Sequence, residues 1–132
     1  MADQPAPMRK TYVEGRFGQM HVRMAGQPGV GKRPLVCFHL SPVSGVIYEN
    51  WIREMGRDRF AIAPDTPGYG MSDPPKSPPE IKDFAAAMID VMDTFGLKEV
   101  DVMGYHTGSK ICVETARQRP DRVKHVVMVS AP

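Results

Sequence analysis

The segment Val100-Asp-Val-Met-Gly-Tyr-His-Thr-Gly108 decides the fold. The apolar run that ends at Met103 is typical of a strand covered on both faces, and a helical pattern begins at Gly108. Gly104 and Gly108 flank His106, and this spacing suits a turn too tight for side chains beside it. Such a turn forces its central residue into strained backbone geometry. We therefore expect the side chain of His106 to stand above the sheet, at the N-terminus of a helix.

Strands and helices alternate on both sides of this segment. The runs Pro34–His39, Phe60–Ala63 and Val123–Val129 share its apolar character, with helical segments between them. This alternation predicts an α/β fold, with a mostly parallel sheet and helices on both faces. Two earlier strands, Lys10–Phe17 and Met20–Ala25, are separated by Gly18 and are expected to form an antiparallel hairpin.

The best-defined helix covers the segment from Ile81 to Phe95. Its apolar residues recur at three- and four-residue steps and form one face, which we assign to the core. Ser77-Pro-Pro-Glu80 is expected to cap its N-terminus, with Pro78 as the first helical residue. Gly96 is expected to end it. Two further helices are expected over Tyr48–Met55 and Gly108–Gln118.

The bulk composition is that of one ordinary globular domain. The 132 residues are 42% hydrophobic and carry a formal net charge of +2, which does not indicate binding to nucleic acid. No stretch approaches the ~18 apolar residues of a membrane helix, and no signal peptide is visible. Cys37 and Cys112 lie in apolar segments, which favours buried thiols in a cytoplasmic protein. Residues 1–9 are Pro-rich and expected to be disordered, so residues 10–132 form the predicted domain.

One phosphate-binding motif is nearly complete but is rejected. Gly26-Gln-Pro-Gly-Val-Gly-Lys32 matches most of a P-loop. That motif requires a Ser or Thr after the lysine to hold Mg²⁺, and then a helix. Here Arg33 stands at the hydroxyl position, and Pro34 opens an extended run. We interpret the segment as a Gly-rich turn between two strands.

Four segments together resemble the α/β-hydrolase superfamily. Gly104–Gly108 matches the nucleophile elbow, Gly-x-nucleophile-x-Gly. His39–Pro42 stands where the family carries His-Gly-x-Pro, and Asp65–Asp73 resembles its Asp-x-Pro-Gly-x-Gly-x-Ser loop. Arg119–Val123 resembles the approach to its sixth strand. Order and spacing agree, so residues 10–132 resemble the N-terminal part of the fold, ending after the sixth strand. The likeness is greatest to the branch of epoxide hydrolases and haloalkane dehalogenases.

The resemblance implies a reaction centre at His106. It implies that the backbone N–H groups of Ser41 and Thr107 stabilise an oxyanion. Leu40 replaces the usual glycine of the family beside this site. For His39 we favour a role in bracing its loop by hydrogen bonds over a direct role. The residues expected to line the substrate pocket are His39, Leu40, Tyr105 and the loop from Asp65 to Ser72.

Three interpretations of His106 remain open, because the family places Ser, Asp or Cys there. Its imidazole can act as a nucleophile or as a base that activates water, and the positive end of the following helix favours the neutral form. Alternatively, the fold has lost hydrolysis and binds a ligand or partner. A third interpretation gives the reaction to Thr107 or Ser109. Ser109 lies about one helical turn further on and is expected to point elsewhere.

The resemblance also implies that an acid and a late histidine follow the sixth strand. His125 lies within that strand and is interpreted as structural or surface. We expect the sequence to be part of a protein about twice as long, and its sixth strand to be an unpaired edge prone to self-association. The expected function is hydrolysis of a small neutral ester, epoxide or similar molecule, without cofactor or metal. The alternative is a catalytically inactive binding protein.

Overall fold

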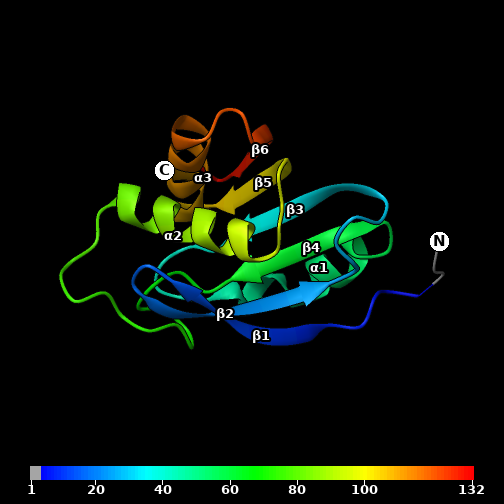
Figure 1. Cartoon of the computed structure of the whole chain (residues 1–132), viewed down its shortest axis with the longest axis horizontal. Coiled ribbons are helices and arrows are strands. Elements are labelled where there is room, and N and C mark those ends of the chain that lie inside the picture. The colour runs from blue at the N-terminus through cyan, green and yellow to red at the C-terminus, as the bar shows by residue number, and fades with distance from the viewer. Residues whose placement is uncertain (1–3) are drawn as a thin grey trace.

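A six-stranded sheet sets the architecture, and the computed structural model describes residues 4–132 (Figure 1). The strands lie in the order β1-β2-β4-β3-β5-β6. Their bounds are β1 (Arg9–Gly15), β2 (Gly18–Ala25), β3 (Lys32–Phe38), β4 (Arg59–Pro64), β5 (Val100–Tyr105) and β6 (Val123–Val129). β2 is antiparallel to β1 and β4, and the other pairs are parallel. The predicted parallel sheet with an N-terminal hairpin is confirmed, although the hairpin turns at Arg16 and Phe17, before Gly18.

Helices cover both faces of this sheet. They are the 3-10 helix η1 (Gly45–Tyr48) and the α-helices α1 (Glu49–Met55), α2 (Ile81–Thr94) and α3 (Thr107–Gln118). α2 and α3 pack together on one face, and α1 lies on the other (Figure 1). Along β3, Val36 and Phe38 belong to the core under α2 and α3, whereas Leu35 and Cys37 belong to the core beside α1. Burial on both faces explains why this strand is apolar from Pro34 to Phe38.

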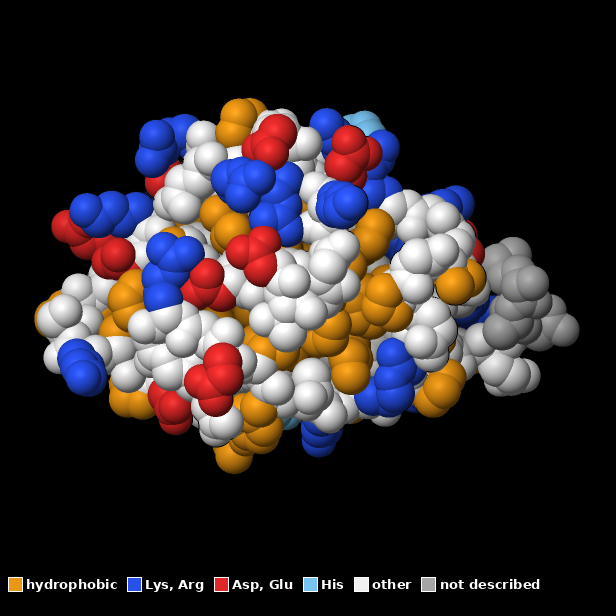
Figure 2. Space-filling model, in the orientation of Figure 1, with side chains coloured by type: hydrophobic (Ala, Val, Ile, Leu, Met, Phe, Trp, Pro, Cys, Tyr) orange, Lys and Arg blue, Asp and Glu red, His pale blue; other side chains and the backbone are white. Residues whose placement is uncertain are grey.

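The surface that carries α2 has mixed charge. On the face shown in Figure 2, basic and acidic side chains interleave and form no large patch of one sign. Both cysteines are buried and free, as their apolar surroundings in the sequence indicate. No helix within residues 4–132 is long and apolar enough to cross a membrane.

The N-terminus of α2 differs from the prediction. Its N-cap is Glu80 and not Ser77, and Pro78 lies before the helix. The Asp83 carboxylate accepts the Glu80 N–H at 2.8 Å, and the Glu80 side chain accepts the N–H of Asp83 in return. Ser77 and Pro78 each precede a proline, which disfavours helical backbone at both positions. Gly96 follows the helix with a φ of +68°, as predicted for its C-terminal end.

The segment before β1 corrects a second expectation. The Ala6 N–H donates to the Arg53 carbonyl at 2.9 Å, and Arg53 Nε donates to the Ala6 carbonyl at 3.1 Å. Ala6 is also buried in the core cluster beside α1, and Arg9 begins β1. The predicted disorder is therefore wrong for residues 4–9, because backbone pairing and apolar contact hold them against α1. Residues 1–3 lie outside the described part of the chain.

The backbone of α3 lies against the ends of β3 and β5 without space for a side chain. A Cβ on Gly108 would overlap the carbonyl oxygen of Phe38, and one on Gly104 would overlap the backbone of Gly108. Either overlap would force the helix away from the sheet. The two glycines are therefore required by close approach, which confirms the predicted tight turn.

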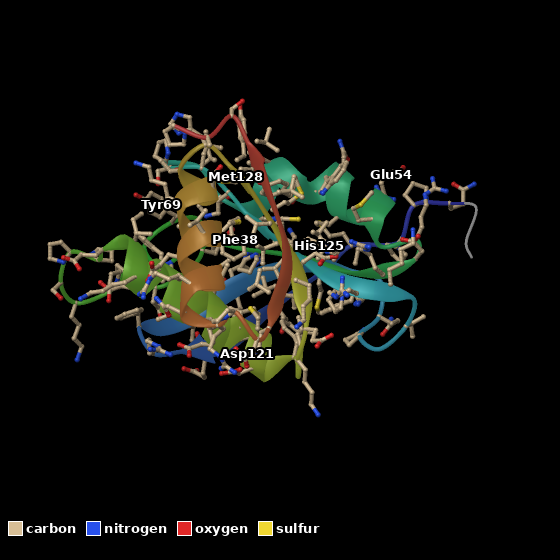
Figure 3. All side chains as sticks on the ribbon, turned by 90° about the horizontal axis from the view of Figure 1, so that it is seen from above. Phe38, Glu54, Tyr69, Asp121, His125 and Met128 are labelled. Carbon is tan, nitrogen blue, oxygen red and sulfur yellow. The ribbon has the colours of Figure 1, made fainter. Side chains whose placement is uncertain are left out.

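β6 forms one edge of the sheet and exposes apolar side chains. Figure 3 shows it from above, with Met128 and His125 on the edge strand. The outer side of an edge strand offers backbone N–H and C=O groups without partners. The exposed apolar residues are Val126, Val127, Met128 and Val129. Self-association of this chain through β6 stays a prediction, and these residues are the surface on which it depends.

Replacing Gly108 is expected to destabilise the protein. Gly108→Ala places a methyl group against the Phe38 carbonyl and should lower the free energy of unfolding by about 1–3 kcal/mol or more. Lys110→Ala, at an exposed position on the same helix, is the matched control and should change it by less than about 0.5 kcal/mol. Chemical denaturation measures both. Equal stability of the two variants would show that the contact is not required.

The isolated 132-residue chain is expected to self-associate through its β6 edge. Val127→Lys should reduce this association, because a charge on the edge opposes strand pairing. Val113→Lys on α3 is the control, since Val113 is 49% exposed and Val127 is 48% exposed. Light scattering after gel filtration gives the mass of each. A wild-type chain that is a monodisperse, cooperatively melting monomer would contradict this expectation.

Candidate functional site

The predicted site residues come from two loops that meet at one edge of the sheet. One loop follows β3 and carries Ser41, and the other is the turn from β5 into α3. β3 and β5 are parallel neighbours, so their carboxyl ends lie side by side. The Ser41 N–H donates to Thr107 Oγ1 at 2.7 Å. The structure therefore brings Ser41, His106 and Thr107 together, as the sequence predicted.

His106 has backbone geometry that few residues other than glycine adopt. Its φ is 55° and its ψ is −116°. Its N–H donates to the Val129 carbonyl at 2.9 Å, and its carbonyl accepts from the Ser109 N–H at 3.0 Å. Strain of this kind costs about 1–3 kcal/mol and persists only where the surroundings enforce it. The side chain is exposed, and no group among residues 4–132 hydrogen-bonds to its imidazole. The imidazole is therefore available to bind a ligand.

The two expected oxyanion donors are in different states. Thr107 is the first residue of α3, so its N–H has no acceptor within the helix. The Ser41 N–H already donates to the Thr107 hydroxyl. It reaches a substrate oxygen only if the Thr107 side chain turns away. The Thr107 N–H is thus available to a substrate oxygen, whereas the Ser41 N–H is already hydrogen-bonded to Thr107.

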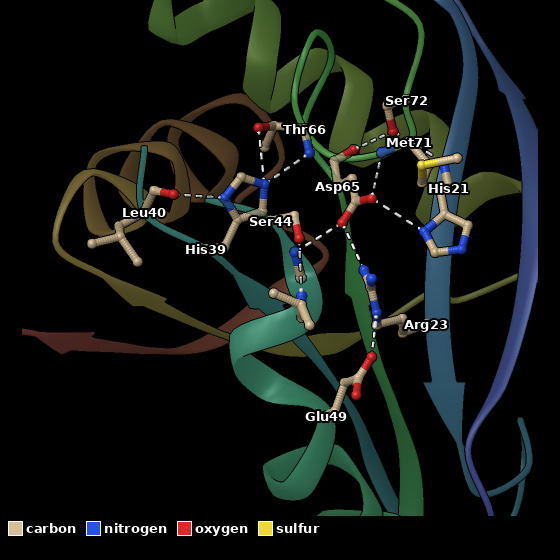
Figure 4. Close-up of polar contacts among 12 residues, drawn as sticks. His21, Arg23, His39, Leu40, Ser44, Glu49, Asp65, Thr66, Met71 and Ser72 are labelled. Atoms are coloured by element: carbon tan, nitrogen blue, oxygen red, sulfur yellow. Dashed lines mark hydrogen bonds and ion pairs between the residues drawn. The ribbon is translucent and has the colours of Figure 1, made fainter. Parts of the chain in front are cut away.

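His39 is enclosed, and both of its ring nitrogens have partners (Figure 4). Nδ1 lies 2.8 Å from the Leu40 carbonyl oxygen, and Nε2 lies 3.0 Å from the Thr66 N–H nitrogen. These partners assign the proton to Nδ1. Burial lowers the pKa of His39, which keeps the ring neutral. These contacts support the bracing role, because His39 connects the loop after β3 to the loop after β4.

Asp65 anchors the loop after β4 and is fully buried (Figure 4). Its Oδ1 accepts from the Gly45 N–H at 2.8 Å and from Arg23 at 3.0 Å. Its Oδ2 accepts from the Met71 N–H at 3.0 Å and from His21 Nδ1 at 3.1 Å. Four donors thus converge on one carboxylate. The loop motif in the sequence marks Asp65, but no motif marks its basic partners on β2.

Two serine hydroxyls near the site have structural roles. Ser72 Oγ donates to the Asp65 carbonyl at 2.7 Å and accepts from the His21 N–H at 3.0 Å. Ser109 Oγ is buried and donates to the Gly104 carbonyl at 3.2 Å. Neither hydroxyl faces the free imidazole, so the expectation that Ser109 points elsewhere is confirmed.

The remaining predicted residues lie at different distances from the turn. Leu40 is half-buried and Tyr105 is exposed, each beside a residue of the site. His125 pairs in register with Asp101 near the start of β5, away from the His106 turn at its end. Its Nδ1 lies 2.9 Å from Asp101 Oδ1, which is a structural contact as predicted. Within the described residues, no group of three or more His, Cys, Asp or Glu could hold a metal ion.

The buried imidazole of His39 should make the free energy of unfolding depend on pH. Burial lowers the folded-state pKa of His39 below the unfolded value of about 6.5. Between these two pKa values the unfolded chain binds more protons, so stability is full above about pH 6.5 and falls as the pH falls. Denaturation at several pH values should show this fall, and His39→Gln should reduce its slope. Identical slopes in the two proteins would contradict the assignment.

Comparison with known proteins gives the family. A family model described as the alpha/beta hydrolase fold matches residues 33–132. Haloalkane dehalogenase 2 from Mycobacterium tuberculosis is 31% identical over 124 residues, which cover 92% of this chain and 42% of that protein. The 2-hydroxymuconate semialdehyde hydrolase from Pseudomonas sp. is 28% identical over 102 residues, covering 74% of this chain and 36% of that protein. This chain thus spans less than half the length of these relatives.

Solved structures of other hydrolases have the same fold. The epoxide hydrolase CorEH superimposes with a TM-score of 0.88 at 23% identity, covering 95% of this chain and 43% of that one. The N-acyl homoserine lactonase AidH gives a TM-score of 0.84 at 27% identity, covering 94% of this chain and 45% of that one. The match at 23% identity establishes the fold alone, whereas the family model spans most of the sequence. The chain therefore belongs to the α/β-hydrolase-fold family.

Proposed function

We propose that this chain supplies the reaction centre of a hydrolase that acts on a small neutral substrate, such as an ester or an epoxide. The observation that carries the proposal is His106. Its backbone is held at a φ of 55° between two glycines that have no space for a Cβ, and its imidazole is exposed and unpaired within the described residues. Strain that surroundings enforce at one polar residue is typical of functional sites.

The surroundings of His106 favour chemistry that develops negative charge. The imidazole stands at the N-terminus of α3, where the helix dipole opposes the imidazolium and favours an anion. As a nucleophile, a ring nitrogen attacks the electrophilic carbon of the substrate. As a base, it takes a proton from the attacking water instead. In both routes the substrate oxygen gains negative charge, which the free Thr107 N–H can stabilise.

Relatives support the substrate class. An N-acyl homoserine lactonase and a 2-hydroxymuconate semialdehyde hydrolase are among the similar proteins. An epoxide or a lactone is a small molecule with an electrophilic carbon bound to oxygen. Such a substrate needs no metal or organic cofactor in the proposed steps. The buried free thiols support a reducing, cytoplasmic setting as part of the same proposal.

A non-catalytic binding protein is the second candidate. The observation that favours it is the engaged Ser41 N–H, which donates to Thr107 and not into open space. No carboxylate within residues 4–132 orients the His106 imidazole, in contrast to the oriented base of a catalytic triad. A ligand held by His106 without turnover would agree with both observations.

Substitution of His106 separates the two functions. In the complete protein, His106→Ala should lower the rate of ester or epoxide hydrolysis by about 10²–10⁴-fold, because it removes the nucleophile or base. His125→Ala is the matched control, since it removes an exposed histidine of β6 that pairs with Asp101 near the start of β5, and it should leave the rate unchanged.

Two outcomes of this experiment decide against catalysis by His106. If His106→Ala retains the wild-type rate, the imidazole has no catalytic role. If the wild type is inactive and only His106→Ser turns over substrate, the natural protein is a binding protein built on an enzyme fold. Steady-state kinetics with an ester and an epoxide measure both.

A further inference from the structure

Within residues 4–132, the Thr107 hydroxyl accepts one hydrogen bond and donates none. Oγ1 accepts the Ser41 N–H at 2.7 Å, at the short end of the range for an N–H···O bond. A hydroxyl carries one O–H donor besides its acceptor lone pairs. No group among residues 4–132 accepts that O–H. The donor is therefore available beside His106, the preceding residue.

We infer that the Thr107 hydroxyl, and not the Ser41 N–H, donates to the substrate oxygen. This inference rests on the proposed hydrolase function and extends it to the substrate class. The substrate would be an electrophile whose reacting carbon bears oxygen, such as an ester, a lactone or an epoxide. A haloalkane bears no oxygen on its reacting carbon, so it offers no substrate oxygen to this donor.

The hydrogen bond from the Ser41 N–H makes the Thr107 hydroxyl a stronger and better positioned donor. A hydroxyl that accepts a hydrogen bond becomes a stronger donor, since linked hydrogen bonds polarise one another. The Ser41 loop is itself held, because His39 bonds to the adjacent Leu40 carbonyl and to Thr66. The Thr107 side chain is thus fixed before a substrate arrives, which is how preorganised donors lower a barrier.

The electron flow needs no proton from Thr107. When His106 attacks an ester, the nitrogen–carbon bond forms and the carbonyl π pair moves onto the oxygen. That oxygen accepts hydrogen bonds from the Thr107 O–H and the Thr107 N–H. When the pair returns, the carbon–oxygen bond to the alcohol breaks, and the departing alkoxide takes a proton from water. That water becomes hydroxide, which adds to the carbonyl carbon of the cationic acyl-imidazolium. The carbon–nitrogen bond then breaks, which releases the carboxylic acid and neutral His106.

Two variants of Thr107 test the inference in the complete protein. Thr107→Val keeps the shape and removes the hydroxyl, and should lower kcat for an ester by about 10²–10³-fold with KM within about threefold. Thr107→Ser keeps the hydroxyl and should remain within about threefold of the wild type in both constants. The split between kcat and KM distinguishes a donor to the transition state from a structural contact.

The opposite results would overturn the inference that the Thr107 hydroxyl donates to the substrate oxygen. Thr107→Val frees the Ser41 N–H, so if that N–H were the true donor, the Val variant would keep or exceed the wild-type kcat. A Thr107→Ser variant as impaired as Thr107→Val would show that the hydroxyl is not the active group. Faster turnover of a haloalkane than of an ester by the wild type would contradict the substrate class.

A binding measurement separates this inference from the proposed function. Acetate offers an anionic oxygen and can be titrated while the amide NMR signals of Ser41 and Thr107 are followed. The wild type and Thr107→Ser should show saturable shifts, and Thr107→Val should bind at least tenfold more weakly. Equal binding by Thr107→Val would overturn the donor role, even if no protein turned over substrate.

Discussion

The site depends on Gly104 and Gly108, where there is no space for a Cβ. Because both residues are glycines, the first turn of α3 packs directly against the carboxyl ends of β3 and β5. His106 lies between the two glycines and has a φ of 55° in this turn. The same contact sets the N-terminus of α3 beside the loop after β3. A wider turn would relax His106 and separate Thr107 from Ser41.

A second, polar constraint holds the loops on the other side of the site. The Asp65 carboxylate is buried, and the charge of Arg23 and three further donors compensate for the lost hydration. Removing one member of a buried group of this kind typically costs several kcal/mol. Because Asp65 is fixed, the adjacent Thr66 can donate to His39. A continuous set of contacts therefore runs from β2 to the Ser41 loop and on to Thr107.

The sequence predicts the sheet and the turn well, because both depend on local patterns. Apolar runs identify the buried strands, and the spacing of Gly104 and Gly108 identifies the tight turn. The N-cap of α2 is misplaced because Ser77 matches a capping pattern, whereas the prolines that follow it prevent helical backbone there. Residues 4–9 are misjudged because their composition does not reveal that Ala6 docks on α1.

Contacts between distant side chains account for the rest of what sequence reasoning misses. His21 and Arg23 reach Asp65 across 44 and 42 positions of the chain, and only the register of β2 on β4 brings them together. The bond between Ser41 and Thr107 spans 66 positions and depends on one side-chain rotamer. No local pattern encodes that rotamer, so the engaged state of the Ser41 N–H emerges only from the structure.

Chemical modification tests the role of His106 most directly. Diethyl pyrocarbonate acylates accessible neutral imidazoles, and peptide mass spectrometry can follow each histidine while ester turnover is measured in the same samples. Buried His21 and His39 should react slowly, whereas the exposed His106 and His125 should react first. Turnover should fall in proportion to modification of His106 alone. Turnover that persists after His106 is fully modified would contradict a reaction centre at this residue.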